Sequence, residues 1–144
     1  MRRNDTRRNS FNQQVRRSNH ITVIIGGAYQ GKCTYAREKY GLSESDISVC
    51  EGETFDPAAR AIAHLERFSL AVTGRGGEPI DVLREKCPDL ADKILIADDI
   101  SCGVVPTDAL QRAWREAHGR MMNTLSREAD GAVRLFCGLP QVLK

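Results

Sequence analysis

The sequence contains no apolar run long enough to cross a membrane and few aromatic residues. A membrane-spanning helix needs about 20 apolar residues, whereas the longest candidate runs here are Ile21–Ile25 and Ile94–Ala97. Aromatic residues make up 6% of the 144 residues and hydrophobic residues 41%. The arginines near the start precede no apolar stretch, so no secretory signal is predicted. These features argue against a membrane or secreted protein and favour one globular domain in the cytoplasm.

Paired cysteine motifs are also absent. The five cysteines lie 15 to 37 residues apart, without a C-x-x-C pair or a Cys/His cluster at zinc-ligand spacing. This pattern predicts buried, reduced thiols rather than disulfides or a zinc site. Cys33 is the exception, because it follows a glycine-rich loop. The cysteines are Cys33, Cys50, Cys87, Cys102 and Cys137.

Positive charge is concentrated at the start of the chain. Six arginines against Asp5 give residues 1–20 a net charge of +5, so the other residues carry −3 of the total of +2. A segment so poor in apolar residues cannot offset the entropy of ordering. We therefore expect 1–19 to be a disordered basic leader and 20–144 to be the folded domain. The leader either contacts a polyanion weakly or is a solvated tail, and nucleic acid is not expected as the main partner.

Strand and helix patterns alternate along the remaining chain, which predicts an α/β domain with a mostly parallel sheet. Asp56 and Pro57 resemble a helix start, and Ser69–Thr73 is either a strand or a loop. Thr107 is expected to cap the long helix. The expected strands are 21–25, 47–50, 94–97 and 132–137, and the expected helices are 32–39, 58–68, 79–86 and 108–127.

A glycine-rich loop between the first expected strand and helix carries the strongest functional signal. It matches the phosphate loop G-x-x-x-x-G-K-[S/T] except at the last position, which is Cys33. Glycines let backbone N–H groups surround phosphates, and the lysine reaches the outer phosphates. The strand–loop–helix context therefore predicts an ATP- or GTP-binding site of the P-loop NTPase type. Its candidate nucleotide-binding residues are Gly26, Gly27, Ala28, Tyr29, Gln30, Gly31, Lys32, Cys33 and Thr34.

The metal positions of this candidate site are altered. The usual hydroxyl after the lysine coordinates Mg²⁺, whereas a neutral thiol such as that of Cys33 is a poor ligand for this hard ion. Thr34 follows it but is expected to point elsewhere on the helix. A second element of such sites is an apolar strand that ends in aspartate. The strand 94–97 is followed by Asp98 and Asp99, either of which is a candidate Mg²⁺ ligand.

Together these segments resemble the bifunctional adenosylcobinamide kinase/adenosylcobinamide-phosphate guanylyltransferase family. The loop is similar to the family's G-G-A-x-S-G-K-S, and 96–106 to V-S-N-E-V-G-x-G-I-V-P. The segment Arg112–Arg120 is similar to R-x-F-R-D-x-x-G-R, and 129–144 to the family's ending. The resemblance covers about 21–144 and implies P-loop kinase chemistry. It also implies guanylyl transfer from GTP to adenosylcobinamide phosphate, and a small homo-oligomer such as a trimer.

The resemblance also implies roles for particular residues. The family's guanylyl acceptor is a histidine on a helix after the second strand, in a pattern like R-I-x-x-H. Residues 60–64 follow this layout, with the same spacing from arginine to histidine but with the isoleucine one position later. His64 is therefore the candidate nucleophile, with Lys32 as the other catalytic residue, although an isolated helical histidine is commonly a surface residue. Arg60 and Arg67 are expected on its helix face, and Glu78 matches the family's E-P pair. Arg60 and Glu78 are therefore further candidate nucleotide-binding residues.

One departure concerns the family's D-C-L-T-L-W-L strand. It normally lies between the E-P pair and the V-S-N-E strand and carries a metal-site aspartate, but 79–94 contains no such segment. The chain is therefore interpreted as a shortened member with altered metal positions, also at Met122, where the family has asparagine. Two alternatives stay open: a nucleotide-binding homologue with impaired catalysis that acts as a regulatory subunit, and a P-loop kinase for another small substrate.

Overall fold

The computed structural model describes residues 20–101 and 106–144. The expected basic leader, Cys102 and the G-V-V part of the 96–106 segment lie outside these ranges. In the described residues, a six-stranded sheet is covered by helices on both faces. The elements are β1 (Thr22–Gly26), α1 (Lys32–Tyr40), η1 (Glu44–Asp46), β2 (Ile47–Val49), β3 (Ala61–Ala63), α2 (Leu65–Gly74), α3 (Pro79–Lys86), β4 (Ile94–Asp98), α4 (Ala109–Glu128), β5 (Gly131–Phe136) and β6 (Leu139–Val142).

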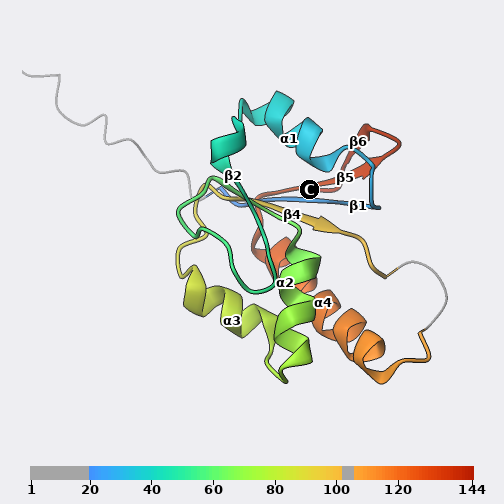
Figure 1. The fold of residues 1–144 in the computed structure, drawn as a ribbon. Coiled ribbons are helices and arrows are strands. Elements are labelled where there is room, and N and C mark those ends of the chain that lie inside the picture. Colours follow the sequence, from blue (N-terminus) through green and yellow to red (C-terminus); the bar gives the residue numbers. More distant parts are fainter. Residues whose placement is uncertain (1–19, 102–105) are drawn as a thin grey trace, which may run out of the picture.

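The sheet has the order β2-β3-β4-β1-β5-β6 and is parallel except for β6, which pairs antiparallel with β5. Helix α1 covers one face, and α2, α3 and α4 cover the other (Figure 1). Successive side chains of β4 alternate between these faces, so Leu95 packs with α2 and α4 while Ile96 packs with α1. The mostly parallel α/β fold predicted from the sequence is confirmed.

Strand β3 corrects the prediction of a helix over 58–68. Asp56 does not cap a helix; its Oδ1 accepts a hydrogen bond from the Ala58 amide at 2.9 Å, and the chain then enters the sheet. Ala61, Ile62 and Ala63 are fully buried between β2 and β4. A short strand that is buried on both faces does not alternate between polar and apolar residues. Its sequence is therefore as consistent with a buried part of a helix as with a strand.

Two further expectations, for Ser69–Thr73 and for Thr107, are wrong, whereas the absence of a strand from 79–93 is confirmed. Helix α2 contains Ser69–Thr73, which were expected to form a strand or a loop. The place in the sheet beside β4 is filled by β3, so the domain has a strand there although 79–93 contains none. Asp108 caps α4 in place of Thr107, because its side chain accepts hydrogen bonds from Leu110 and Gln111.

The carboxyl ends of β1, β3 and β4 meet at one edge of the sheet. Gly26 pairs with Asp98 in the parallel register of β1 and β4, and His64 directly follows β3. Ligands of open parallel α/β sheets bind at this edge. No helix in the described part of the chain is long and apolar enough to cross a membrane.

Candidate functional site

The glycine-rich loop connects β1 to the first residue of α1, as the sequence predicted. Gly31 precedes the helix with φ = 82°, and Tyr29 also lies in the left-handed region with φ = 60°. Gly26 lies against β5, where an added Cβ would be 2.7 Å from the Leu135 carbonyl oxygen. Gln30 connects the loop to the turn between β5 and β6, because its Oε1 accepts a hydrogen bond from the Cys137 amide. The loop conformation therefore depends on glycine and on the β5–β6 turn.

Lys32 points back into the loop toward the end of β4. Its Nζ lies 2.6 Å from Asp98 Oδ1 and donates a hydrogen bond to the Gly27 carbonyl oxygen at 2.7 Å. The lysine is only 6% exposed, so this pairing satisfies a charge that would be costly to bury alone. Asp98 is thus the aspartate that the structure brings to the loop. Asp99 bonds to Ser101 and lines a neighbouring cavity.

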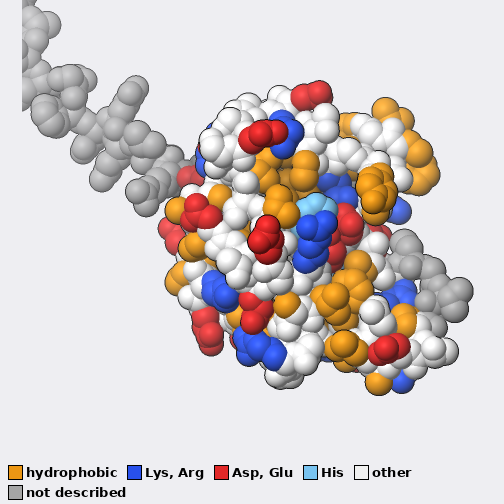
Figure 2. Space-filling view, in the orientation of Figure 1, with side chains coloured by type: hydrophobic (Ala, Val, Ile, Leu, Met, Phe, Trp, Pro, Cys, Tyr) orange, Lys and Arg blue, Asp and Glu red, His pale blue; other side chains and the backbone are white. Residues whose placement is uncertain are grey.

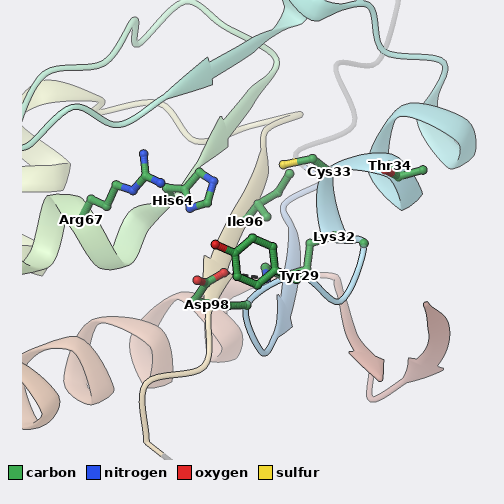
Figure 3. Close-up of a pocket in the computed structure, with 10 residues that line it drawn as sticks. Tyr29, Lys32, Cys33, Thr34, His64, Arg67, Ile96 and Asp98 are labelled. Atoms are coloured by element: carbon green, nitrogen blue, oxygen red, sulfur yellow. Dashed lines mark ion pairs between the residues drawn. The ribbon is translucent and has the colours of Figure 1, made fainter. Parts of the chain in front are cut away.

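A pocket of about 340 Å³ lies between the loop and the carboxyl ends of β3 and β4. Figure 3 shows His64 and Arg67 on one side of this pocket and Lys32 and Cys33 on the other. The cationic side chains of Lys32 and Arg67, together with the backbone N–H groups of the loop, are suited to binding phosphates. The lining residues are Ala28, Tyr29, Gly31, Lys32, Cys33, Thr34, His64, Arg67, Ile96 and Asp98.

His64 lines this pocket. It was expected within a helix, but the structure places it just before one. It connects β3 to α2 with φ = 60°, and it is the N-cap residue of α2. Arg60 therefore does not share a helix face with it. The face of the molecule seen in Figure 2 shows a histidine at the surface, beside cationic and acidic side chains.

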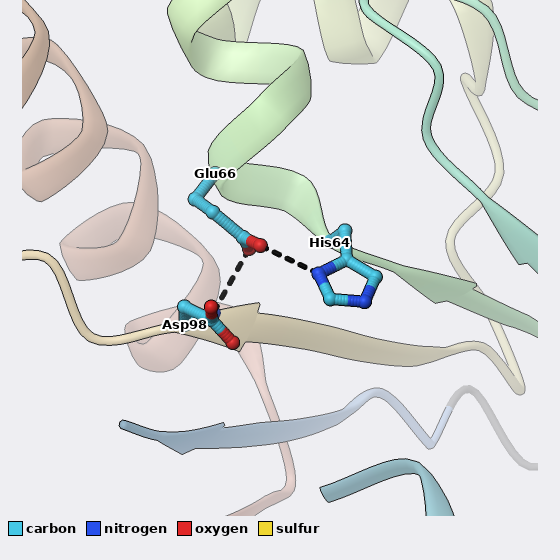
Figure 4. Close-up of side chains that lie close together, drawn as sticks. All are labelled: His64, Glu66 and Asp98. Carbon is cyan, nitrogen blue, oxygen red and sulfur yellow. Dashed lines mark hydrogen bonds and ion pairs between the residues drawn. The ribbon is translucent and has the colours of Figure 1, made fainter. Parts of the chain in front are cut away.

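Glu66 fixes the orientation of the histidine ring. His64 Nδ1 lies 2.7 Å from Glu66 Oε1, and Glu66 Oε2 accepts a hydrogen bond from the Asp98 amide at 2.9 Å (Figure 4). A carboxylate accepts from Nδ1–H, so in the neutral ring the lone pair is on Nε2. This is the arrangement of a histidine prepared to act as a nucleophile or base. Glu66 was not among the residues singled out from the sequence.

A buried polar cluster holds the first turn of α2 against α4. Trp114 Nε1 donates to the Glu66 carbonyl oxygen at 3.1 Å and lies 2.9 Å from Ser69 Oγ. Ser69 Oγ lies 2.8 Å from His118 Nδ1. Burial lowers the pKa of His118, which keeps its imidazole neutral, although the nearby Glu66 carboxylate opposes this effect. The cluster therefore supports the backbone that carries Glu66.

Cys33 and Thr34 both line the pocket. Burial raises the pKa of the Cys33 thiol, and the nearby charges of Arg37 and Lys32 only partly oppose this effect. The thiol is therefore neutral at pH 7 and offers the pocket a soft, weakly polar atom. Cys50 and Cys87 are buried as expected, whereas Cys137 is exposed.

Two residues implied by the family resemblance lie elsewhere. Arg60 precedes β3, whereas His64 follows it, so the two residues lie at opposite ends of this strand. Arg60 Nη1 lies 3.8 Å from Asp46 Oδ2. Glu78 pairs with Arg120 at 3.0 Å. Neither Arg60 nor Glu78 lines the pocket, whereas Arg67 does.

Comparison with known families agrees with the resemblance. Residues 77–143 match the family model of cobinamide kinase/cobinamide phosphate guanyltransferase. A search of curated proteins finds no match. The matched segment is slightly less than half of the chain and contains α3, β4, α4, β5 and β6. It includes Asp98 but begins after the phosphate loop and His64, so the assignment of those residues depends on their pattern and geometry.

Proposed function

We propose that this chain phosphorylates adenosylcobinamide with a nucleoside triphosphate and then transfers GMP from GTP to adenosylcobinamide phosphate. It would act in cobalamin assembly or salvage in the cytoplasm. The family match supports the substrate class. The observation that carries the proposal is that His64, with its Nδ1 bonded to Glu66, shares one pocket with the phosphate loop.

His64 is the proposed guanylyl acceptor. Nε2 attacks the α-phosphorus of GTP, the bond from that phosphorus to the bridging oxygen breaks, and pyrophosphate leaves. An oxygen of adenosylcobinamide phosphate then attacks the same phosphorus and breaks the P–N bond, which regenerates the free imidazole. Glu66 would stabilise the ring while it carries positive charge, because its carboxylate faces Nδ1. Arg67 lies beside the ring and would neutralise phosphate charge.

Lys32 is the proposed ligand of the outer phosphates in both reactions. Its ammonium group now pairs with Asp98, and a triphosphate in the loop would replace that partner. In the kinase reaction, the substrate hydroxyl oxygen attacks the γ-phosphorus, and the nucleoside diphosphate leaves. The loop residues would position this phosphorus, which supplies most of the catalysis in such transfers.

The residues present fit a nucleotide-bound Mg²⁺ at Asp98, whose carboxylate offers the oxygen ligands that this ion prefers. Cys33 does not fit it, because a neutral thiol is a soft ligand. When bound to the triphosphate, Mg²⁺ would neutralise phosphate charge. Asp99 faces the neighbouring cavity and is the weaker candidate for this role.

Exposed apolar side chains on the β5–β6 hairpin support the homo-oligomer implied by the family resemblance. Phe136, Leu139, Val142 and Leu143 are 53–73% exposed. Covering such a patch with a second copy would remove it from water. A solution mass measurement that gives a monomer would contradict this part of the proposal.

The activity test is incubation of the protein with adenosylcobinamide, Mg²⁺ and either ATP or GTP, followed by mass analysis of the corrinoid. We expect adenosylcobinamide phosphate first and adenosylcobinamide-GDP with GTP. Nucleotide binding without a corrinoid product would favour the non-catalytic homologue. Nucleotide turnover on other small alcohols alone would favour a kinase with a different substrate.

A further inference from the structure

We propose that His64, Glu66 and Asp98 form a binding site for one divalent transition-metal ion such as Zn²⁺. Each side chain offers one ligand atom, and these atoms all lie within 4.8 Å of one another (Figure 4). His64 and Glu66 lie at the start of α2, directly after β3, and Asp98 ends β4, so two backbone segments distant in the sequence position the three donors.

The chemistry of the donors selects the class of metal. An imidazole nitrogen is a good ligand for Zn²⁺, Co²⁺ and Ni²⁺, whereas Mg²⁺ prefers oxygen ligands alone. One histidine and two carboxylates give three protein ligands, and the pocket in front of His64 and Asp98 leaves room for a fourth from solvent. This site differs from the nucleotide-bound Mg²⁺ considered above, because it uses His64 and needs no phosphate.

Only small movements are needed to bring the donors to bonding distance. Ligand atoms around a tetrahedral zinc lie about 3.4 Å apart. The distance between His64 Nδ1 and Glu66 Oε1 would increase from 2.7 Å, and a pair of donors at the 4.8 Å limit would move closer by about 1.4 Å. Glu66 is almost fully buried and is held by the Asp98 amide, so it is the least mobile of the three ligands.

Lys32 is the group that opposes the metal. Its ammonium lies 2.6 Å from Asp98 Oδ1 and would repel a nearby dication. Removing that charge by Lys32→Met should tighten metal binding by about tenfold or more. A gain of affinity on loss of a lysine is not expected from adventitious binding at surface carboxylates.

The site has a consequence for His64, and this consequence rests on the proposed function. A metal on Nδ1 replaces the proton there, so the neutral ring carries its proton on Nε2 and no longer has a lone pair on that nitrogen. Bound Zn²⁺ would therefore prevent His64 from accepting GMP. Metal binding itself does not depend on any activity and is measured separately.

The test is titration of the reduced protein with Co²⁺, followed by visible absorption and calorimetry without nucleotide. We expect one equivalent to bind, without the charge-transfer band of a thiolate ligand. Affinity should fall on the order of 10–100-fold or more in His64→Gln and in Glu66→Gln, since even the loss of an outer partner costs that much. His20→Gln removes an exposed histidine outside the site and is the matched control.

Several results would overturn the site. One is that Co²⁺ does not bind in a one-to-one ratio. Another is that wild type and His64→Gln bind Co²⁺ with equal affinity. A third is that Cys33→Ser no longer binds Co²⁺, which would assign the metal to the thiol. His64 is partly exposed, so its substitution should leave the fold intact, and a melting curve checks this. Co²⁺ binding in a protein that never accepts GMP would contradict the proposed function and leave the metal site standing.

Discussion

Glu66→Gln is the substitution whose effect follows most directly from the site geometry. The two oxygens of Glu66 each accept a hydrogen bond, one from His64 Nδ1 and one from the Asp98 amide. Glutamine has the same shape but only one acceptor oxygen. If that oxygen still accepts the hydrogen bond from the Asp98 amide, the glutamine NH₂ group faces His64 Nδ1. An NH₂ group donates to Nδ1, so it favours the imidazole tautomer that is protonated on Nε2. The proposed nucleophile then has no lone pair.

The magnitude can be taken from the equivalent change in the serine-protease triad, where a wrong tautomer lowers kcat by about 10⁴-fold. Glu66 is buried and its partner His64 is partly exposed, so we expect a loss of about 10²–10⁴-fold, or about 3–5 kcal/mol in the activation free energy. The assay is the rate of GMP incorporation from α-labelled GTP. Glu53→Gln, which removes the charge that pairs with Arg75 outside the pocket, is the control. Equal rates in the two variants would refute the reasoning.

Three further substitutions test the loop. Lys32→Ala should weaken triphosphate binding much more than monophosphate binding in calorimetric titrations, and equal losses for GTP and GMP would contradict its assignment to the outer phosphates. Cys33→Ser should lower the Mg²⁺ concentration for half-maximal activity, whereas an unchanged Mg²⁺ dependence would leave Asp98 as the ion's protein ligand. Gly26→Ala should lower the free energy of unfolding by about 1–3 kcal/mol in urea titrations, because its Cβ would meet the Leu135 carbonyl oxygen. A stability equal to that of wild type would show that β1 and β5 can separate there.

The phosphate loop was predictable from the sequence because each of its parts has a local cause. A β-branched run forms β1, glycines permit the turn, and Lys32 begins a helix that ends at Gly41 in the left-handed conformation. The choice between Asp98 and Asp99 was not local. Successive residues at the end of a strand point to opposite sides, and only the packing of β4 beside β1 decides which one meets Lys32.

The surroundings of His64 were not predictable for a related reason. The residues around it have helical periodicity, and the buried three-residue strand β3 has no alternation that would reveal it. Glu66 was missed because side chains two residues apart do not meet on a helix. They meet here because His64 lies just outside α2 with a positive φ. The buried Ser69–His118 contact joins residues 49 positions apart, which no local pattern reports.

The central claim is that His64 accepts GMP from GTP, and covalent labelling tests it most directly. The protein and His64→Asn are incubated with α-labelled GTP, and the labelled product is treated with acid and with base. We expect wild type to carry a label that is lost in acid and persists in base, as a phosphoramidate does, and His64→Asn to carry none. An acid-labile label of equal amount in His64→Asn, or no label in wild type under conditions where GTP binds, would contradict the claim.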